Sequence, residues 1–392
     1  MAGGGGRIIV IGGGVIGLAC AAWLARRGAE VLVLERFEHV HNLGSHGGHT
    51  RVTRRAYHEG SAYVPLVTES EGLWEQLERD PGAGGPGSIL VRSGLIEAGP
   101  VDDRDLKEVF AACVAHGLEH RVHDASALWD RYGLRVPPEW IGCETPSGGY
   151  LRVGPAMNGL RRAAMAAGAS FRYQAEVKEI ACGQTLRVLL ESGELLPCER
   201  IVVAAGAYLQ PLLPSRLRGL FAVRRRILAW SSPPSEARER LAELPVWAVF
   251  APRGMYYGFP YGDHGVAGFK LACHRYQAPS DPKNLSAEAA LREVKADELI
   301  ELDQFLAEFL PAARGPWASA EVCLYNCTPS GDFLVDRHPD DARVILTGGF
   351  SGHGFKFAPA IARLVGELLD RGEAADLPSI FRWPHHLAGP SF

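Results

Sequence analysis

Six residues near the start of the chain, 12–17, have the types and spacing needed to hold a phosphate group. They satisfy the pattern G-x-G-x-x-G, in which each glycine has a separate task. Gly12 permits a tight turn, Gly14 lets the backbone approach a pyrophosphate, and Gly17 lets a following helix pack closely against a strand. Free backbone amides and the positive end of that helix would hold the anion. The pattern predicts a dinucleotide site.

A carboxylate follows this turn at the expected distance. Glu35 lies 18 positions after Gly17, where it can bind ribose hydroxyls and would repel a ribose phosphate, which argues against NADP. The neighbouring Arg36 is a signal in favour of NADP, but its side chain should point to the other face of the strand. The pattern alone does not separate FAD from NAD. FAD is favoured because the turn lies at the extreme N-terminus, and because a second strand and turn at 200–207 could return to the same cofactor.

The elements around the turn give it the required context. Residues 7–11 form an apolar run typical of a buried strand, 18–27 are predicted to form a helix that Gly28 caps, and 31–34 form a second strand. Together they make one βαβ unit, whose right-handed crossover places the two strands side by side. The glycine pattern is weak alone and specific in this setting.

Strands and helices alternate at both ends of the chain, around a centre rich in strands. The predicted helices are 63–77, 101–116, 124–132, 154–167, 287–310 and 359–370. The predicted strands are 170–180, 185–190, 200–204, 223–231, 246–251, 254–260, 266–271 and 344–347. This order predicts an α/β protein in which a β-rich α+β substrate domain interrupts a Rossmann-like FAD-binding domain. We assign 1–80, 146–220 and 320–392 to the FAD-binding domain and 81–145 and 221–319 to the substrate domain.

The amino-acid composition of the chain excludes several classes of function. The 392 residues are 47% hydrophobic and 22% charged with a net charge of -4, and no basic block favours nucleic acid. The apolar stretch at 8–25 is interrupted by glycines and too short to span a membrane. The eight cysteines include no CxxC pair, which disfavours zinc, and no metal site is expected. With no export signal, we expect a cytoplasmic enzyme with reduced thiols.

Three further segments carry a family likeness. They are Gly44-Ser45-His46-Gly47-Gly48-His49-Thr50-Arg51-Val52-Thr53-Arg54-Arg55-Ala56-Tyr57, then Val322-Cys323-Leu324-Tyr325 with Asp336-Arg337-His338-Pro339, and Gly349-Phe350-Ser351-Gly352-His353-Gly354-Phe355-Lys356-Phe357. With the glycine turn, they resemble the monomeric sarcosine oxidase and pipecolate oxidase family, flavoenzymes of the D-amino-acid-oxidase superfamily. The resemblance covers nearly the whole chain and is strongest at its two ends.

The resemblance implies that the FAD is covalently bound. A cysteine in this Cys-x-Tyr context is joined to the flavin 8α-methyl group in the family, so Cys323 is the expected link. The chemistry is reasonable because a thiolate can add to the electron-poor edge of the flavin. An inert buried cysteine is the ordinary alternative, and Cys327 is a weaker candidate for the link.

The resemblance also implies roles for charged and aromatic residues. Arg54 and Lys356 match the positions that hold the substrate carboxylate, which suits a guanidinium fork and a second positive charge. Lys270 matches the lysine near flavin N5 that promotes reaction with oxygen, where a positive charge stabilises superoxide. Pocket positions are matched by His274, Tyr257 and Tyr325. Solvent-facing lysine or arginine and packed core residues are the alternatives for these positions.

The expected FAD contacts come from the turn and the matching segments together. They are Gly12, Gly14, Val15, Ile16, Gly17, Glu35, Arg36, Ser45, His46, Thr50, Arg51, Val177, Ala205, Gly206, Cys323, Gly349, Phe350, Gly352, His353, Gly354, Phe355 and Lys356.

Three positions depart from the family pattern. Gly47 stands where some members have the second of two adjacent histidines, which puts any mechanism needing that imidazole in doubt. His49 replaces an acidic or amide residue. Ala248 stands where sarcosine oxidases have methionine, and the smaller side chain indicates room for a substrate larger than sarcosine.

These observations predict an FAD-dependent oxidase that converts a secondary or cyclic amino acid to an imine and reduces O2 to hydrogen peroxide. Its partners would be a small amine with a carboxylate and O2, and the resemblance implies a monomer. Four alternatives stay open: an NAD-dependent amino-acid dehydrogenase, a glycine-oxidase-like enzyme, a biosynthetic flavin oxidase or dehydrogenase of a larger cyclic amine, and a flavoprotein that binds without catalysis.

Overall fold

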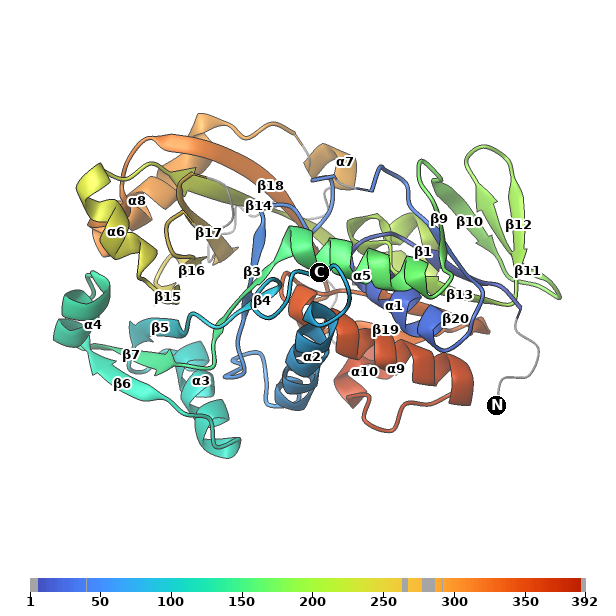
Figure 1. Cartoon of the computed structure of the whole chain (residues 1–392), viewed down its shortest axis with the longest axis horizontal. Coiled ribbons are helices and arrows are strands. Elements are labelled where there is room, and N and C mark those ends of the chain that lie inside the picture. Colours follow the sequence, from blue (N-terminus) through green and yellow to red (C-terminus); the bar gives the residue numbers. More distant parts are fainter. Residues whose placement is uncertain (1–5, 40, 263–266, 277–285, 291, 389–392) are drawn as a thin grey trace.

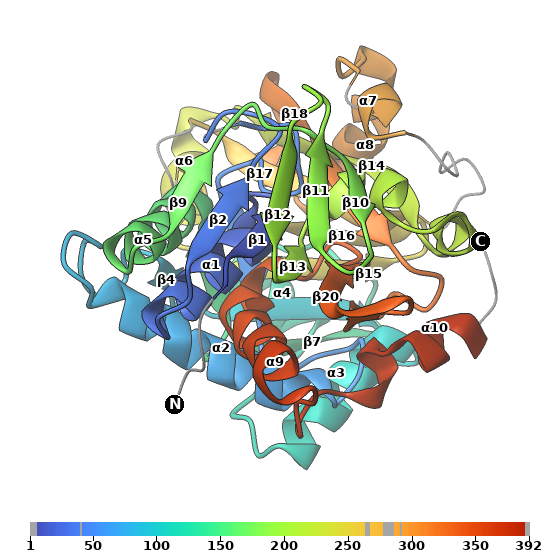
Figure 2. The same ribbon diagram turned by 90° about the vertical axis from the view of Figure 1, so that its right-hand side faces the viewer.

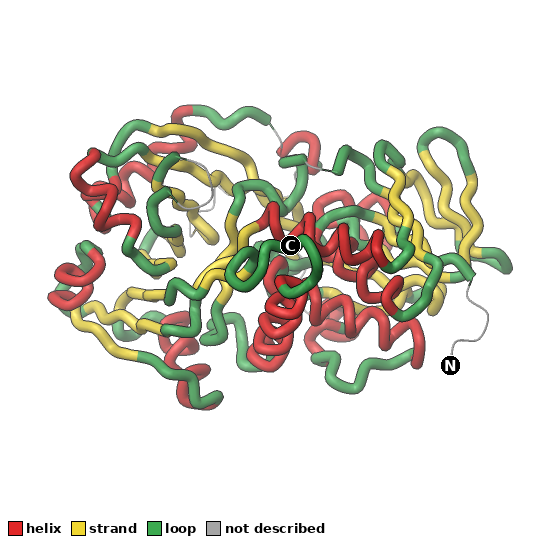
Figure 3. The backbone as a smooth tube through the Cα atoms, in the orientation of Figure 1, coloured by secondary structure: helices red, strands yellow, loops and turns green. Residues whose placement is uncertain are grey.

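Two large β-sheets lie along the long axis of the molecule, each in its own half (Figure 1). This computed structural model describes residues 6–39, 41–262, 267–276, 286–290 and 292–388. One half is built on a six-stranded sheet and the other on an eight-stranded sheet. Figure 3 shows helices around both sheets, with loops concentrated at the ends of the strands.

The six-stranded sheet has the order β19-β20-β13-β1-β2-β9. Its strands are β1 (Ile8–Ile11), β2 (Val31–Leu34), β9 (Ser170–Arg172), β13 (Arg200–Val203), β19 (Leu334–His338) and β20 (Asp341–Gly348). All neighbours are parallel except β19, which runs antiparallel to β20. The central strand β1 is apolar and buried throughout, as a parallel strand covered on both faces must be. The predicted βαβ unit and the predicted Rossmann-like fold class are confirmed.

The two faces of this sheet are covered differently. Ile8 and Val10 belong to the core shared with α1 (Val15–Arg26), α2 (Tyr63–Glu78), α5 (Val153–Ala166) and α9 (Ala358–Arg371). Ile9 and Ile11 pack instead toward a small antiparallel sheet, β10 (Val177–Ala181), β11 (Leu186–Leu190) and β12 (Leu195–Cys198). Figure 2 shows the two layers on either side of β1 and β2. The strand predicted at 185–190 is confirmed as β11, which forms a hairpin with β12.

The eight-stranded sheet has the order β18-β14-β17-β16-β15-β5-β7-β6. Its strands are β5 (Leu95–Pro100), β6 (Arg121–Asp124), β7 (Trp140–Thr145), β14 (Ala222–Ser231), β15 (Val246–Ala251), β16 (Gly254–Gly258), β17 (Phe269–Tyr276) and β18 (Trp317–Cys327). One face carries the core beneath α4 (Ala125–Tyr132), α6 (Ser235–Ala242) and α8 (Ile300–Phe309). Near β5 and β7, the other face contacts α3 (Arg104–Ala115).

A second small sheet lies between the two halves. It consists of β3 (Thr50–Thr53), β8 (Gly149–Arg152) and β4 (Leu90–Val91), with β8 in the centre (Figure 1). The remaining elements are short helices: α7 (Ala287–Ala290), α10 (Trp383–Ala388), η1 (Gly206–Tyr208), η2 (Gln210–Leu212), η3 (Ser215–Leu220), η4 (Ala296–Leu299), η5 (Pro311–Ala313), η6 (Phe355–Phe357) and η7 (Ser379–Phe381).

Two sequence predictions about local structure are wrong. The single strand predicted at 170–180 is two strands, β9 and β10, that belong to different sheets. The chain turns between them, and Gln174 has a left-handed backbone with a φ of 53°. The helix predicted at 287–310 is also interrupted, and residue 291 lies outside the described part. The Arg225 guanidinium donates to the carbonyls of Ala290 and Arg292, so these groups bond to a side chain instead of continuing a helix.

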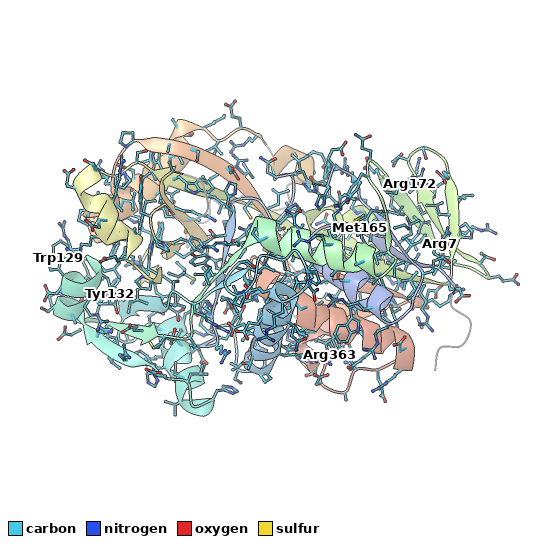
Figure 4. All side chains as sticks on the ribbon, in the orientation of Figure 1. Arg7, Trp129, Tyr132, Met165, Arg172 and Arg363 are labelled. Atoms are coloured by element: carbon cyan, nitrogen blue, oxygen red, sulfur yellow. The ribbon has the colours of Figure 1, made fainter. Side chains whose placement is uncertain are left out.

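The remaining predicted elements agree with the structure to within a few residues. One exception is the strand predicted at 266–271, since β17 begins at Phe269 and residue 266 lies outside the described part. No helix within the described ranges is long and apolar enough to cross a membrane. All eight cysteines are free thiols. Trp129 and Tyr132 mark one end of the molecule and Arg7 and Arg172 the other (Figure 4).

Candidate active site

A cavity of about 510 Å³ opens where the parallel strands of the six-stranded sheet end. Ligands of open α/β sheets bind at this edge, because the loops that follow the strands can surround them there. The lining comes from the turn after β1, the end of β2, the loop after β13, the 44–51 segment and the 350–355 segment. The predicted FAD contacts that line it are Gly12, Gly14, Val15, Ile16, Glu35, Arg36, Ser45, His46, Arg51, Val177, Ala205, Gly206, Phe350, Gly352, Gly354 and Phe355.

The glycine turn has the geometry that its sequence predicts. Gly12 has a φ of 105°, and a Cβ there would lie 2.4 Å from the carbonyl oxygen of Ala204. A Cβ on Gly17 would lie 1.8 Å from the carbonyl oxygen of Gly12, so α1 can approach β1 only with glycine at this position. Gly14 is the N-cap of α1 and lines the cavity, and no side chain of the described residues caps the helix. The first amides of α1 are therefore available to an anion.

Glu35 is held by main-chain amides at the end of β2. One carboxylate oxygen accepts from the amide of Gly13 at 2.6 Å and the other from the amide of Phe37 at 2.8 Å. The adjacent Arg36 donates to Glu288 at 2.8 Å and lies 3.2 Å from Glu176, so its charge is already paired. A fixed carboxylate beside a paired arginine suits unphosphorylated ribose hydroxyls.

The 44–51 segment closes one side of the cavity. Arg51 holds it in shape, because its guanidinium donates to the carbonyls of Ser45 and Gly47 at 2.7 and 2.5 Å. His46 is half-buried, and its buried Nε2 has no hydrogen-bond partner within the described chain. Burial lowers the pKa of His46 to about 3, so the imidazole is neutral. A neutral, unpartnered ring nitrogen at the cavity fits a polar ligand such as FAD.

Cys323 lies on β18, close to this segment but not in the lining of the cavity. The side chain is 2% exposed, and its sulfur lies 3.7 Å from both the Ser45 carbonyl oxygen and an Arg51 nitrogen. Cys327 is four residues further along the strand and is partly exposed. Arg51 therefore contacts Cys323 and also lines the large cavity.

Lys270 is buried on β17 and donates to Thr50, the first residue of β3, and to the loop before it. Its Nζ lies 2.9 Å from the Thr50 hydroxyl and 3.1 Å from the Thr50 carbonyl oxygen, and it also donates to the Gly48 carbonyl. Burial, and then the positive charge of Arg51, lower the pKa of Lys270 well below its usual value. Thr50, expected to contact FAD, is thus an acceptor for Lys270 and does not line the large cavity.

A second cavity of about 60 Å³ adjoins the first, and Arg51, Tyr325, Gly352 and Phe355 line both. Five of the six predicted catalytic residues line this second cavity, and Lys270 is the one that does not. Those five residues are Arg54, Tyr257, His274, Tyr325 and Lys356. Tertiary structure has therefore brought together residues from β16, β17, β18, η6 and the loop after β3.

Arg54 is buried at this cavity, so the alternative of a solvated surface arginine is excluded. Its side chain forms a two-oxygen ion pair with Glu59, at 2.6 and 2.8 Å, and its guanidinium lies 4.2 Å from the centre of the Tyr57 ring. Burial alone would raise the pKa of Glu59, but Arg54 and His58 hold it well below its usual value. Glu59 lines the second cavity as well, and it is a residue that the sequence analysis did not identify.

Lys356 is buried in η6, directly before α9. Its Nζ donates to the His353 carbonyl at 2.9 Å and to the Tyr57 hydroxyl at 3.3 Å. Its own carbonyl accepts from Ser70 and Trp74, which fixes η6 against α2. Burial, and then Arg54, lower the pKa of Lys356 to about 7, so the amine is partly neutral near physiological pH. A bound carboxylate would favour its charged form.

The aromatic side of the cavity is a hydrogen-bonded group of three residues. The Tyr325 hydroxyl lies 3.2 Å from His274 Nδ1, and Tyr257 forms a hydrogen bond with Tyr325. Burial raises the pKa of both phenols, so both remain protonated and can donate. These groups can orient a polar substrate without carrying charge.

The 349–357 segment supports both cavities. The Gly349 amide donates to the Asn326 side chain at 2.7 Å, and a Cβ on Gly352 would lie 2.1 Å from the Tyr325 ring. His353 bonds to the Tyr57 hydroxyl at 2.7 Å and lines the second cavity. Some predicted FAD contacts therefore do not line the large cavity: Gly17, Thr50, Cys323, Gly349, His353 and Lys356.

Besides Glu59, another acidic residue of the second cavity was missed at the level of sequence. Glu97, on β5, is fully buried, and neither of its carboxylate oxygens has a hydrogen-bond partner among the residues that the structure describes. Ala248 lies beside it on β15 and lines the same cavity. The signal in the sequence that could have identified Glu97 is a single acidic residue inside the apolar run at 95–98.

Comparisons with known proteins agree with this site. A model of the FAD dependent oxidoreductase family matches residues 7–368. The chain is 30% identical over 379 residues to monomeric sarcosine oxidase of Bacillus sp. (strain NS-129), covering 95% of both chains. It is 30% identical over 362 residues to N-methyl-L-tryptophan oxidase of Yersinia pestis (strain Pestoides F), covering 91% of this chain and 93% of that protein.

The fold is also that of a solved flavoenzyme. NikD, described as an unusual amino acid oxidase essential for nikkomycin biosynthesis, superimposes with a TM-score of 0.81 at 22% identity, covering 99% of this chain and 98% of NikD. The glycine turn, the amide-held Glu35 and the unpartnered His46 nitrogen all suit the FAD that the family binds. The chain thus belongs to the FAD dependent oxidoreductase family and is a flavin-dependent amine and amino-acid oxidase acting on CH–NH groups.

Proposed function

We propose that this oxidase acts on a secondary or cyclic amino acid larger than sarcosine, forming an imine and hydrogen peroxide. The observation that carries the proposal is the second cavity, where Arg54 and Lys356 stand together beside the larger cavity. When bound, FAD supplies the hydride acceptor and transfers the electrons to O2. The protein positions the amine and provides the electrostatic environment.

Arg54 and Lys356 bind the substrate carboxylate in this proposal. Arg54 is already oriented by Glu59, so its guanidinium is fixed before the substrate arrives. The pKa of Lys356, near 7, rises when a carboxylate approaches, so binding is accompanied by proton uptake at its Nζ. The hydroxyls of Tyr257 and Tyr325 hold the uncharged amine near the shared wall of the two cavities.

Cys323 is the proposed covalent attachment point of FAD. Its support is the family resemblance together with its position within 3.7 Å of both Ser45 and Arg51, which line the large cavity. Cys327 is the matched control, since it lies on the same strand four residues away.

Lys270 is proposed to promote the reaction with oxygen. Its Nζ is fixed by Thr50 and Gly48, in the segment that leads from the large cavity into β3. A cation held there would stabilise superoxide as it forms. Because burial lowers its pKa, its charge depends on pH and on the groups that bind beside it.

The preference for a substrate larger than sarcosine rests on one small residue. Ala248 lines the second cavity, at the position where the family resemblance places a methionine in sarcosine oxidases. We also propose the division into an FAD-binding domain of 1–80, 146–220 and 320–392 and a substrate domain of 81–145 and 221–319. The enzyme is proposed to act as a monomer.

The test is anaerobic bleaching of the flavin by a substrate panel. Sarcosine, proline, pipecolate and bulkier N-methyl and cyclic amino acids are mixed with the enzyme under nitrogen, and absorbance near 450 nm is followed. We expect faster bleaching by a bulkier compound than by sarcosine, and an imine product. Bleaching by no amino acid would refute the proposed function, and fastest bleaching by sarcosine would refute the larger substrate.

A further inference from the structure

The carboxylate of Glu97 has no evident structural purpose where it lies. The residue is 0% exposed, and both side-chain oxygens lack a hydrogen-bond partner within the described ranges. An isolated buried carboxylate is costly, because nothing replaces the water that it loses. Apolar residues occupy the same strand on either side, so a hydrophobic residue would stabilise the sheet better. The cost indicates a binding role.

The register of the sheet places Glu97 in the wall of the second cavity. Glu97 pairs with Ala248 on β15, and Ala248 pairs with Tyr257 on β16. Opposite partners in a sheet point to the same face, so these three side chains form a row. All three line the second cavity together with Arg54 and Lys356. The small side chain of Ala248 separates the acid from the tyrosine.

The charges of the cavity indicate what Glu97 would bind. Arg54 is paired with Glu59 and Arg51 donates to main-chain carbonyls, whereas no donor of the described residues lies within hydrogen-bond distance of the Glu97 carboxylate. The substrate carboxylate on Arg54 and Lys356 cannot supply a donor to Glu97. The reacting amine is uncharged when it loses hydride, so it cannot supply an opposite charge. A cationic N–H group elsewhere on the substrate would give Glu97 both a donor and an opposite charge.

We propose that Glu97 is a specificity-determining residue that selects substrates whose side chain ends in a cationic N–H group, an ammonium or a guanidinium. The inference rests on the proposed function, because it assumes that Arg54 and Lys356 bind the substrate carboxylate. The substrate is then an N-alkyl or cyclic amino acid with a basic side chain. Its cation forms a buried ion pair with Glu97 and supplies the missing hydrogen bonds.

Binding of three carboxylates of equal length tests the pairing without turnover. The ligands are 5-aminopentanoate, 5-hydroxypentanoate and hexanoate, which differ only in a terminal ammonium, hydroxyl or methyl group. None of them carries the α-amine that is oxidised. Dissociation constants are measured calorimetrically with the holoenzyme and with the Glu97→Gln and Glu97→Leu variants. The ratio between ligands cancels any general weakening of the site.

We expect the wild-type preference for 5-aminopentanoate over hexanoate to fall at least tenfold in both variants. Asp105→Asn is the matched control, because Asp105 acts on Glu97 electrostatically but does not line the cavity. Its ratio should stay within threefold of wild type. If Glu97→Leu does not fold, Glu97→Gln carries the same comparison. An unchanged ratio, equal gains for hydroxyl and ammonium, or no binding by any ligand would overturn the inference.

Turnover separates this inference from the proposed function. The kcat/KM values of N-methyl-ornithine and N-methyl-norleucine, whose side chains have equal length, are compared in wild type and Glu97→Gln. We expect the wild type to favour N-methyl-ornithine at least tenfold and the variant to lose this preference. Oxidation of both compounds at equal rates by the wild type would refute the role of Glu97 and leave the proposed function standing.

Discussion

Replacing Glu97 by glutamine should stabilise the protein at neutral pH and leave it unchanged in acid. Burial is the main reason that the pKa of Glu97 is raised from 4.5 to about 7. Glu59 and Asp105 raise it further, whereas Arg54 and Lys356 lower it. The side chain has no hydrogen-bond partner among the described residues, so glutamine loses no interaction and removes the ionisation.

The sign and size of this change in stability follow from proton linkage. Between pH 4.5 and about 7, the folded protein binds the Glu97 proton more tightly than the unfolded chain, so stability falls as pH rises through this window. The full loss, above pH 7, corresponds to about 3 kcal/mol. Unfolding of 392 residues at ~2.1 cal/mol/K per residue converts this into a Tm difference of about 4 °C.

The assay is thermal unfolding of substrate-free wild type and Glu97→Gln between pH 5 and 8. The Tm of the variant should exceed that of the wild type by an amount that grows with pH. Glu59→Gln is the control of opposite sign, since Arg54 lowers the pKa of Glu59 and its loss removes an ion pair at neutral pH. A Tm difference for Glu97→Gln that is flat or shrinks with rising pH would refute the reasoning.

Three other predictions concern the proposed site. Acid-precipitated wild type and Cys327→Ser should stay yellow, whereas Cys323→Ser should release its flavin; release from the wild type would exclude a covalent link. Reoxidation of reduced flavin should accelerate as pH falls, because the lowered pKa of Lys270 makes its protonation pH-dependent. Reoxidation of the flavin in Lys270→Met should be slow and independent of pH, while reduction of its flavin by substrate changes little. Stopped-flow measurements that show equal effects on both half-reactions would contradict the proposed role of Lys270. Arg54→Met should lower kcat/KM by roughly 10²–10³-fold, equivalent to about 3–4 kcal/mol for a buried charge partner, and Arg54→Lys should lower it less. An unchanged KM in Arg54→Met would show that the substrate carboxylate does not bind to Arg54.

The short-range features of the site could be predicted from the residues alone. The turn at 12–17 is set by local steric limits, since no residue with a Cβ fits at Gly12 or Gly17. The strand at 31–34 and the position of Glu35 follow from the same unit, because a βαβ crossover has one hand. The 349–357 segment is distinctive enough to indicate the family, which the family comparison confirms.

Longer-range features escaped sequence analysis. The chain at 170–180 has the composition of one strand, yet it is divided because its two ends pair with strands of different sheets. The helix predicted at 287–310 is interrupted because Arg225, more than sixty residues earlier, bonds to its carbonyls. Neither partner could be inferred from local composition.

The sequence by itself determined the βαβ unit, its phosphate turn and the family of the protein, because backbone sterics and hydrophobic periodicity act over neighbouring residues. Only the tertiary structure decided the second cavity. It joined Arg54 to Glu59, brought both beside Lys356 from the far end of the chain, and buried Glu97 without a partner. The burial and charge of these groups depend on contacts between segments that are distant in sequence, and such contacts exist only once both sheets have formed.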